Sequence, residues 1–235
     1  MCGILAIIGN GQQHAPGLAE QALNMIYHRG PDDQGTWQAD GVWLGHQRLS
    51  IIDTSSGGHQ PMVDAITGVA ITFNGEIYNY IELRAELVAL GQQFFSHSDT
   101  EVLLRAYLVW GQKCVQRFNG DWAFVIWDPR TRTAFISRDR FAVKPLYLAR
   151  VGGALAVASE PKALLHLYPQ LRRVNERALF RFLNESALYD HADCFYDGIE
   201  LLLPAHNAVY KPDDDVLELG SYWNWPDRKS TRLNS

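Results

Sequence analysis

The sequence predicts an α+β domain whose sheets are mostly antiparallel. Short apolar runs rich in β-branched and aromatic residues come in pairs, and turn-forming residues such as Gly152-Gly153 separate the two runs of a pair. Apolar positions at helical spacing gather in separate stretches instead of alternating with single strands. Because strands joined by short turns lie antiparallel, this order favours antiparallel sheets with segregated helices.

Composition sets broad limits on the function. The chain has 235 residues, a net charge of −5 and 47% hydrophobic residues, so it can bury a sizeable core, and we expect neither a nucleic-acid nor a membrane partner. No apolar run approaches the length of a membrane span, and the N-terminus lacks the pattern of a signal peptide. Cys2, Cys114 and Cys194 are odd in number and far apart, which indicates a reducing, cytoplasmic setting and no metal site.

The N-terminus carries a reactive residue type. Residues 3–9 form an apolar run that predicts a short buried strand directly after Met1-Cys2. If Met1 is removed, Cys2 bears both a thiol with a pKa near 8.5 and an α-amine with a pKa of about 7.7–8.0. A nucleophile and a base then share one residue, as in N-terminal nucleophile catalysis. The alternative is an inert buried cysteine.

The next segments predict a helix and a loop. Apolar spacing from Leu18 predicts a helix to about Tyr27, after a polar turn at residues 14–17. His28-Arg29-Gly30-Pro31-Asp32-Asp33 ends this helix, and its composition favours a solvated connector.

A strand is predicted over residues 42–53, and Arg48 interrupts its apolar pattern. A planar guanidinium can bind a carboxylate through two parallel hydrogen bonds, which makes Arg48 a candidate ligand of a substrate carboxylate. An edge-strand arginine in solvent is the alternative. Residues 54–61 form a loop.

Candidate oxyanion donors follow a short strand at residues 69–73. Asn79 and Glu82 resemble a capping box before a helix, so Asn74-Gly75-Glu76 is expected between strand and helix. The Asn74 side-chain amide and the Gly75 N–H are suitable donors to a developing oxyanion. Glu76 could hold a cationic amine.

Ser98-Asp99-Thr100-Glu101 predicts a second capping box, which places Asp99 in the first turn of a helix. A carboxylate there is favourable with the helix dipole by about 0.3–1 kcal/mol. The functional alternative for Asp99 is a second acidic contact to a substrate ammonium.

The remaining elements are mostly strand pairs. Hairpins are predicted over residues 122–137 and 146–158, and a last strand pair is predicted around residues 212–215. Helices are expected from about Ser159 and over residues 176–183.

Several motifs occur in order and resemble one family. They are Met1-Cys2-Gly3-Ile4, His28-Arg29-Gly30-Pro31-Asp32, Arg48-Leu49-Ser50-Ile51-Ile52-Asp53, Asn74-Gly75-Glu76-Ile77-Tyr78-Asn79 and Ser98-Asp99-Thr100-Glu101. Together they resemble the glutaminase domain of class II glutamine amidotransferases. Arg138-Asp139-Arg140-Phe141, Lys144-Pro145-Leu146-Tyr147 and Ser159-Glu160-Pro161-Lys162-Ala163-Leu164 resemble the branch of glutamine-hydrolysing asparagine synthetases. The resemblance covers about residues 2–225.

The resemblance implies an N-terminal nucleophile hydrolase fold, a four-layer αββα sandwich with two antiparallel sheets. It implies hydrolysis of glutamine to glutamate and ammonia through a γ-glutamyl thioester on Cys2, whose α-amine is the base. The implied roles are the oxyanion hole for Asn74 and Gly75, and binding of the glutamine α-carboxylate for Arg48. Glu76 and Asp99 are implied to bind the α-amine, with backbone contacts from Ile51 and Ile52.

The resemblance also implies a domain division. Residues 2–210 correspond to the glutaminase domain, residues 211–227 to the start of a linker, and residues 228–235 to a non-native or disordered tail. A synthetase domain that converts aspartate to asparagine with ATP and magnesium is absent, and no cofactor is expected in this domain. One departure is Ala142, where the family usually has glycine. Two alternatives stay open: the glutaminase domain of another class II amidotransferase, and a catalytically silent truncated fragment.

Overall fold

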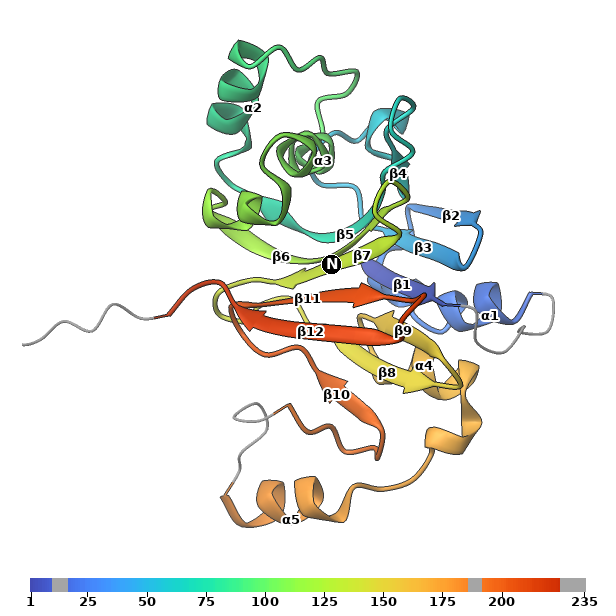
Figure 1. The fold of residues 1–235 in the computed structure, drawn as a ribbon. Coiled ribbons are helices and arrows are strands. Elements are labelled where there is room, and N and C mark those ends of the chain that lie inside the picture. The colour runs from blue at the N-terminus through green and yellow to red at the C-terminus, as the bar shows by residue number, and fades with distance from the viewer. Residues whose placement is uncertain (10–16, 186–191, 225–235) are drawn as a thin grey trace, which may run out of the picture.

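Two six-stranded antiparallel sheets face each other, and helices cover the outer face of each (Figure 1). The structure is a computed structural model that describes residues 1–9, 17–185 and 192–224. The strand order is β10-β8-β9-β1-β3-β2 in the first sheet and β12-β11-β7-β6-β5-β4 in the second sheet. The predicted α+β class and its four-layer arrangement are confirmed.

The first sheet has the N-terminal strand at its centre. Its strands are β1 (Gly3–Ile8), β2 (Asp33–Ala39), β3 (Val42–Arg48), β8 (Tyr147–Val151), β9 (Ala154–Ala158) and β10 (Ile199–Leu201). All six residues of β1 are buried, because β1 pairs with β3 on one side and β9 on the other while both of its faces pack against apolar side chains. The continuous apolar run of β1 is typical of such a strand.

The second sheet is built around a long hairpin. Its strands are β4 (Met62–Val63), β5 (Ala70–Ile77), β6 (Gly120–Asp128), β7 (Thr133–Arg138), β11 (His206–Lys211) and β12 (Val216–Ser221). β6 pairs with β5 and β7, and both pairings are supported by apolar side chains on both faces. The β6–β7, β8–β9 and β11–β12 hairpins occur where the sequence predicts them.

The helices form the outer layers. Helices α1 (Leu18–Asn24) and α4 (Pro161–Leu167) pack on the first sheet, and α2 (Tyr80–Ala89) and α3 (Asp99–Trp110) pack on the second sheet. Helix α5 (Glu176–Glu185) follows, and short 3-10 helices cover Tyr27–Arg29, Ser56–Gly58, Gly111–Gln116 and Pro169–Leu171. Three buried apolar clusters fill the spaces between the four layers, which is where the burial of apolar surface stabilises the fold.

Two boundaries around the candidate site differ from the predictions. The strand predicted over residues 42–53 ends at Arg48, because both neighbours of β3 end there and the chain turns through Asp53, whose φ is +52°. Ile51, which continues the apolar pattern, is 55% exposed. The strand β2 was not predicted, since its alternation of exposed and half-buried residues carries little apolar signal.

The expected position of Asn74-Gly75-Glu76 between strand and helix is wrong. These three residues lie within β5 and pair with residues 121–123 of β6. Asn79 is the N-cap of α2 but makes no capping bond, since its side chain bonds the Arg117 carbonyl and the Asn119 N–H. An asparagine side chain at a helix N-terminus can also bond backbone groups of a neighbouring segment. Here Asn79 bonds the loop at residues 117–119 instead of the backbone of α2.

The ordered sheet extends beyond the predicted domain boundary at residue 210. β12 lies within residues 211–227, the stretch assigned to a linker, and completes the second sheet. The first helix ends at Asn24 instead of Tyr27. Most of the predicted polar turn at residues 14–17 and the whole predicted tail at residues 228–235 lie outside the described residues. Within the described part of the chain, no helix is long and apolar enough to span a membrane.

Candidate active site

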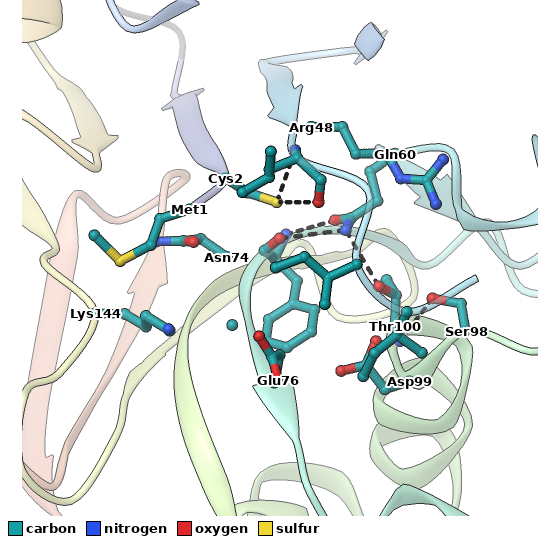
Figure 2. Close-up of a pocket in the computed structure, with 15 residues that line it drawn as sticks. Met1, Cys2, Arg48, Gln60, Asn74, Glu76, Ser98, Asp99, Thr100 and Lys144 are labelled. Atoms are coloured by element: carbon teal, nitrogen blue, oxygen red, sulfur yellow. Dashed lines mark hydrogen bonds between the residues drawn. The ribbon is translucent and has the colours of Figure 1, made fainter. Parts of the chain in front are cut away.

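One cleft collects every site residue that the sequence predicts. Its empty volume is about 500 Å³ with the open mouth included. Figure 2 shows the residues that line it, which come from both sheets and from the start of α3. The predicted residues among them are Cys2, Arg48, Ile51, Ile52, Asn74, Gly75, Glu76 and Asp99.

The two sheets are joined by hydrogen bonds close to the cleft. The buried His46 on β3 donates through Nε2 to the Phe73 carbonyl on β5 at 3.0 Å, and Thr72 Oγ1 donates to the Gly45 carbonyl at 3.1 Å. Burial lowers the pKa of His46 to about 3, so the ring is neutral and one nitrogen carries the donated proton. These bonds hold β5, which carries Asn74, against the first sheet, whose strand β1 directly follows Cys2.

Cys2 lies at the entrance to β1 and is half-buried. Its Sγ accepts a hydrogen bond from the Leu49 N–H at 3.4 Å and lies 3.6 Å from the Leu49 carbonyl. Burial raises the pKa of the Cys2 thiol, although the Leu49 N–H and nearby positive charge act in the opposite direction. A thiol with a raised pKa is mostly protonated at neutral pH, so Cys2 would need a proton acceptor to act as a nucleophile.

Arg29 anchors the Cys2 backbone, and the solvated-connector interpretation of its loop is wrong for this residue. The Arg29 side chain is 8% exposed. Its Nε donates to the Cys2 carbonyl at 2.9 Å, and its Nη1 donates to Glu160 at 2.9 Å. Glu160 also contacts His28 and Lys162, so a cluster of charged and polar side chains holds the Arg29 guanidinium that bonds the Cys2 carbonyl.

Asn74 presents a buried donor without a protein partner. Its side chain is 1% exposed, and Nδ2 makes no hydrogen bond within the described part of the chain. A buried N–H group without an acceptor is costly, which is why such groups often mark a ligand position. The orphaned Nδ2 in the same cleft as Cys2 is the arrangement that an oxyanion hole requires.

Only glycine fits at position 75, because strand β6 lies too close to leave room for a side chain. A Cβ on Gly75 would overlap the Asp121 carbonyl on β6 and would lie 2.6 Å from the Phe73 ring. The Asn-Gly pair, which normally signals a tight turn, is therefore used here for close strand approach.

Arg48 is buried, which excludes the solvated alternative. Its Nη1 donates to the Ser55 carbonyl at 2.9 Å, and its Nη2 donates to the Asp53 carbonyl. A Cβ on Gly58 would overlap Nη2, so this glycine makes room for the guanidinium. These contacts hold Arg48 beside the turn of residues 49–55 and leave further N–H groups for a ligand, since a guanidinium carries five.

Two carboxylates form the acidic side of the cleft. Asp99 is the first residue of α3, after the N-cap Ser98, whose hydroxyl accepts from the Thr100 N–H at 3.1 Å. Asp99 Oδ2 accepts from the Ile77 N–H at 3.0 Å, directly after Glu76. Burial raises the pKa of Asp99 to about 6, and the negative charge of Glu76 acts in the same direction. A bound ammonium group would relieve both effects.

The second half of the predicted capping box at α3 is wrong. The Glu101 carboxylate accepts hydrogen bonds from Phe95 N and Ser96 N instead of reaching back to Ser98 N. Glu101 therefore holds the backbone of the segment that precedes α3, and this helps to fix the position of Asp99 at the cleft.

Some cleft residues were not predicted from the sequence. Gln60 donates to the Phe73 carbonyl and to Thr100 Oγ1, both at 3.2 Å, and accepts from Phe73 N at 2.7 Å, so it ties β5 to α3. Other unpredicted lining residues are Met1, Leu49, Phe73, Ser98, Thr100 and Lys144. Gln60 lies in a Gly- and Ser-rich loop, where no periodicity indicates that a side chain is buried.

Metal ligands do not gather in the part of the chain that the structure describes. No group of three or more His, Cys, Asp or Glu side chains there is placed to hold an ion. The polar groups that line the cleft are a thiol, amide groups and charged side chains.

Several curated proteins of similar sequence are asparagine synthetases of glutamine-hydrolysing type, and others are amidases. The chain is 35% identical to asparagine synthetase [glutamine-hydrolyzing] 3 of Bacillus subtilis over 236 residues, which cover 98% of this chain and 38% of that protein. It is 43% identical over 185 residues to a putative asparagine synthetase of Mycobacterium tuberculosis, which cover 71% of this chain and 28% of that protein. The chain thus spans less than two fifths of the length of these relatives.

The fold is shared with a solved amidotransferase. Glutamine phosphoribosylpyrophosphate amidotransferase from B. subtilis superposes with a TM-score of 0.70 over 94% of this chain and 49% of that one, at 19% identity. This likeness supports the fold, in which two antiparallel sheets lie between helices. A family model described as a glutamine amidotransferase domain matches residues 1–223, which is almost the whole described chain. The chain therefore belongs to the glutamine amidotransferase domain family.

Proposed function

We propose that this domain hydrolyses glutamine to glutamate and ammonia through a γ-glutamyl thioester on Cys2. The observation that carries the proposal is the single cleft in which Cys2, the orphaned Asn74 donor and the acidic pair Glu76 and Asp99 meet. In a member of the glutamine amidotransferase domain family, these groups match the two ends of glutamine and its reacting amide.

The first half of the reaction forms the thioester. With Met1 removed, the free α-amine of Cys2 takes the thiol proton while Sγ attacks the side-chain carbonyl carbon of glutamine. The Asn74 amide and the Gly75 N–H donate hydrogen bonds to the resulting oxyanion. The C–N bond then breaks, and the α-ammonium returns its proton to the leaving ammonia.

The second half releases glutamate. A water molecule, deprotonated by the same amine, attacks the thioester carbonyl carbon, and the oxyanion forms again at Asn74 and Gly75. The C–S bond breaks, Sγ regains a proton, and glutamate leaves. No step requires a cofactor.

Charge complementarity supports the choice of an amino acid as substrate. Arg48 is proposed to bind the α-carboxylate of glutamine, with backbone contacts from Ile51 and Ile52. Glu76 and Asp99 are proposed to bind its α-ammonium group. A guanidinium and two carboxylates that line one cleft favour a zwitterion over a simple amide.

The acceptor of the ammonia is proposed from the relatives. Both bacterial asparagine synthetases compared above are much longer than this chain. We therefore propose that the ammonia serves the ATP-dependent conversion of aspartate to asparagine in a synthetase domain outside this chain, where ATP and magnesium would bind.

The direct test measures glutamate release from glutamine by purified protein whose intact mass shows that Met1 is absent. Release is expected from this form and not from protein that retains Met1, because an amide nitrogen cannot accept the thiol proton. Equal rates in both forms would contradict the role of the α-amine. If the form without Met1 releases no glutamate, the result would indicate that this domain has no glutaminase activity of its own.

The pH dependence of kcat/KM is expected to steepen below pH 6. This parameter reports the free enzyme, in which the Cys2 amine, near pKa 7.7–8.0, and the Asp99 carboxylate must both be unprotonated. The logarithm should therefore rise with a slope of about two below pH 6 and about one between pH 6 and 7.5. In kcat the steeper part should vanish, because bound ammonium lowers the pKa of Asp99.

In the variant Asp99→Asn, the slope of log kcat/KM below pH 6 should fall from about two to about one. KM should rise about tenfold to a hundredfold, which corresponds to the loss of a hydrogen bond to a charged group. The exposed Asp40→Asn is the matched control and should change neither. A slope of two that persists in Asp99→Asn would assign the second proton to another group.

A further inference from the structure

A lysine enters the cleft from the side opposite Asp99, and Figure 2 shows Glu76 between these two residues. Figure 2 shows Lys144 and Met1 on one side of Cys2, with Asp99 and Ser98 on the other. The proposed substrate places its charged α-carbon groups near Arg48, Glu76 and Asp99. The Lys144 ammonium therefore lies on the side of the N-terminal backbone, away from the amino-acid end of glutamine.

The loop that carries Lys144 is held firmly. One oxygen of the Asp139 carboxylate accepts from Phe141 N at 2.9 Å and Val143 N at 3.0 Å, and the other accepts from Lys144 N at 2.9 Å. Arg138 Nε donates to the Lys144 carbonyl at 2.7 Å. Ala142 has a φ of +55°, a left-handed conformation that disfavours a side chain, so the loop keeps a strained shape that presents Lys144 to the cleft.

The Lys144 ammonium has no interaction partner in the described structure. It makes no hydrogen bond or ion pair with residues 1–9, 17–185 or 192–224. Lys144 is half-buried on a backbone that hydrogen bonds hold in place, so it brings a positive charge to the lining of the cleft.

We propose that Lys144 is a positioning residue that keeps the α-amine of Cys2 unprotonated. The inference rests on the proposed function, since it concerns the amine that appears when Met1 is removed. A fixed positive charge near an amine disfavours the ammonium form, and the unprotonated form is the one that accepts the thiol proton.

The other charges around Cys2 set the background for this effect. Arg48 at the end of β3 and Arg29 in the first 3-10 helix are positive, and Arg29 is neutralised by Glu160. Glu76 on β5 and Asp99 on α3 are negative and favour a protonated amine. Arg48 bonds only backbone carbonyls, and Lys144 has no carboxylate partner among the described residues, so both positive groups offset the two acids.

The test is an NMR titration of the Cys2 amine in processed protein labelled with ¹³C-cysteine. Cys114 and Cys194 are buried and have no free amine, so the Cys2 Cα signal reports the α-amine. Lys144→Met, which keeps the stem and removes the charge, should raise the amine pKa by about half a unit to one unit. Lys144→Arg should restore the wild-type value. The exposed Lys113→Met is the matched control and should have no effect.

The kinetic readout separates this inference from the proposed function. At pH 6.5 the kcat/KM of Lys144→Met for glutamine should fall about threefold to tenfold, the same factor as the pKa change, and recover at pH 9. Equal amine pKa values in Lys144→Met and wild type would overturn the inference even if glutamine is hydrolysed. A shifted pKa without any glutamine hydrolysis in wild type would instead overturn the proposed function.

Discussion

The variant Cys2→Ala is expected to lose glutamine hydrolysis, with kcat lowered by roughly 10⁴-fold or more, as when the nucleophile of a covalent hydrolase is removed. Alanine is small, so Met1 removal and the α-amine should be preserved. Because Sγ makes only weak contacts with Leu49, the fold should remain. The measurement is glutamate release, together with calorimetric binding of glutamine, which should persist.

The matched control is Cys194→Ala, which removes a buried thiol outside the cleft. Its glutaminase rate should equal that of wild type. In addition, mass spectrometry of wild type quenched during turnover should show the added γ-glutamyl group on the peptide that contains Cys2. Residual hydrolysis near the wild-type rate in Cys2→Ala would contradict the thioester route.

The variant Asn74→Ala is expected to lower kcat by about 10²–10³-fold with a smaller change in KM, the cost of losing one oxyanion-hole donor. The reason is that Nδ2 has no acceptor in the described structure and gains one only when negative charge forms on the substrate oxygen. Steady-state kinetics with glutamine give both parameters.

Stability separates this effect from a structural one. Because Nδ2 makes no protein hydrogen bond, Asn74→Ala breaks none when it removes that group, and the melting temperature should change by only a few degrees. Asn207→Ala in β11 is the matched control, since its amide also has a buried atom without a partner but lies outside the cleft. An equal loss of kcat in both variants would indicate a general disturbance of the second sheet.

The chemistry of the cleft could be predicted from the sequence better than its backbone. Cys2, Asn74 and Asp99 stand out because a thiol, an amide and a carboxylate each lie close to an apolar run, and all three line the cleft. The backbone around Asn74 could not be predicted, because Asn-Gly favours a turn locally. The absence of a Cβ on Gly75 instead allows β6 to approach, a requirement that only the tertiary structure sets.

The residues that support the site were harder to predict for a related reason. Arg29 and Gln60 lie in polar, turn-rich segments, and local composition indicates solvent exposure there. Both side chains are buried because they bond backbone groups of Cys2 and of β5, which lie in other segments of the chain. The prediction of a strand at residues 49–52 was wrong for the opposite reason. These residues continue the apolar pattern of β3, but the strands that pair with β3 have ended there.

The central position of β1 has a consequence for the order of events during synthesis. Leu5 and Ile8 pair with Ala158 and Leu155, and Ile4 bonds Ser159 through both its N–H and its carbonyl. The first strand therefore cannot complete its pairing until about 150 further residues have left the ribosome, roughly ten seconds or more at ordinary translation rates. We expect a methionine aminopeptidase to act within that interval, so that the amine is exposed before β9 completes the pairing of β1.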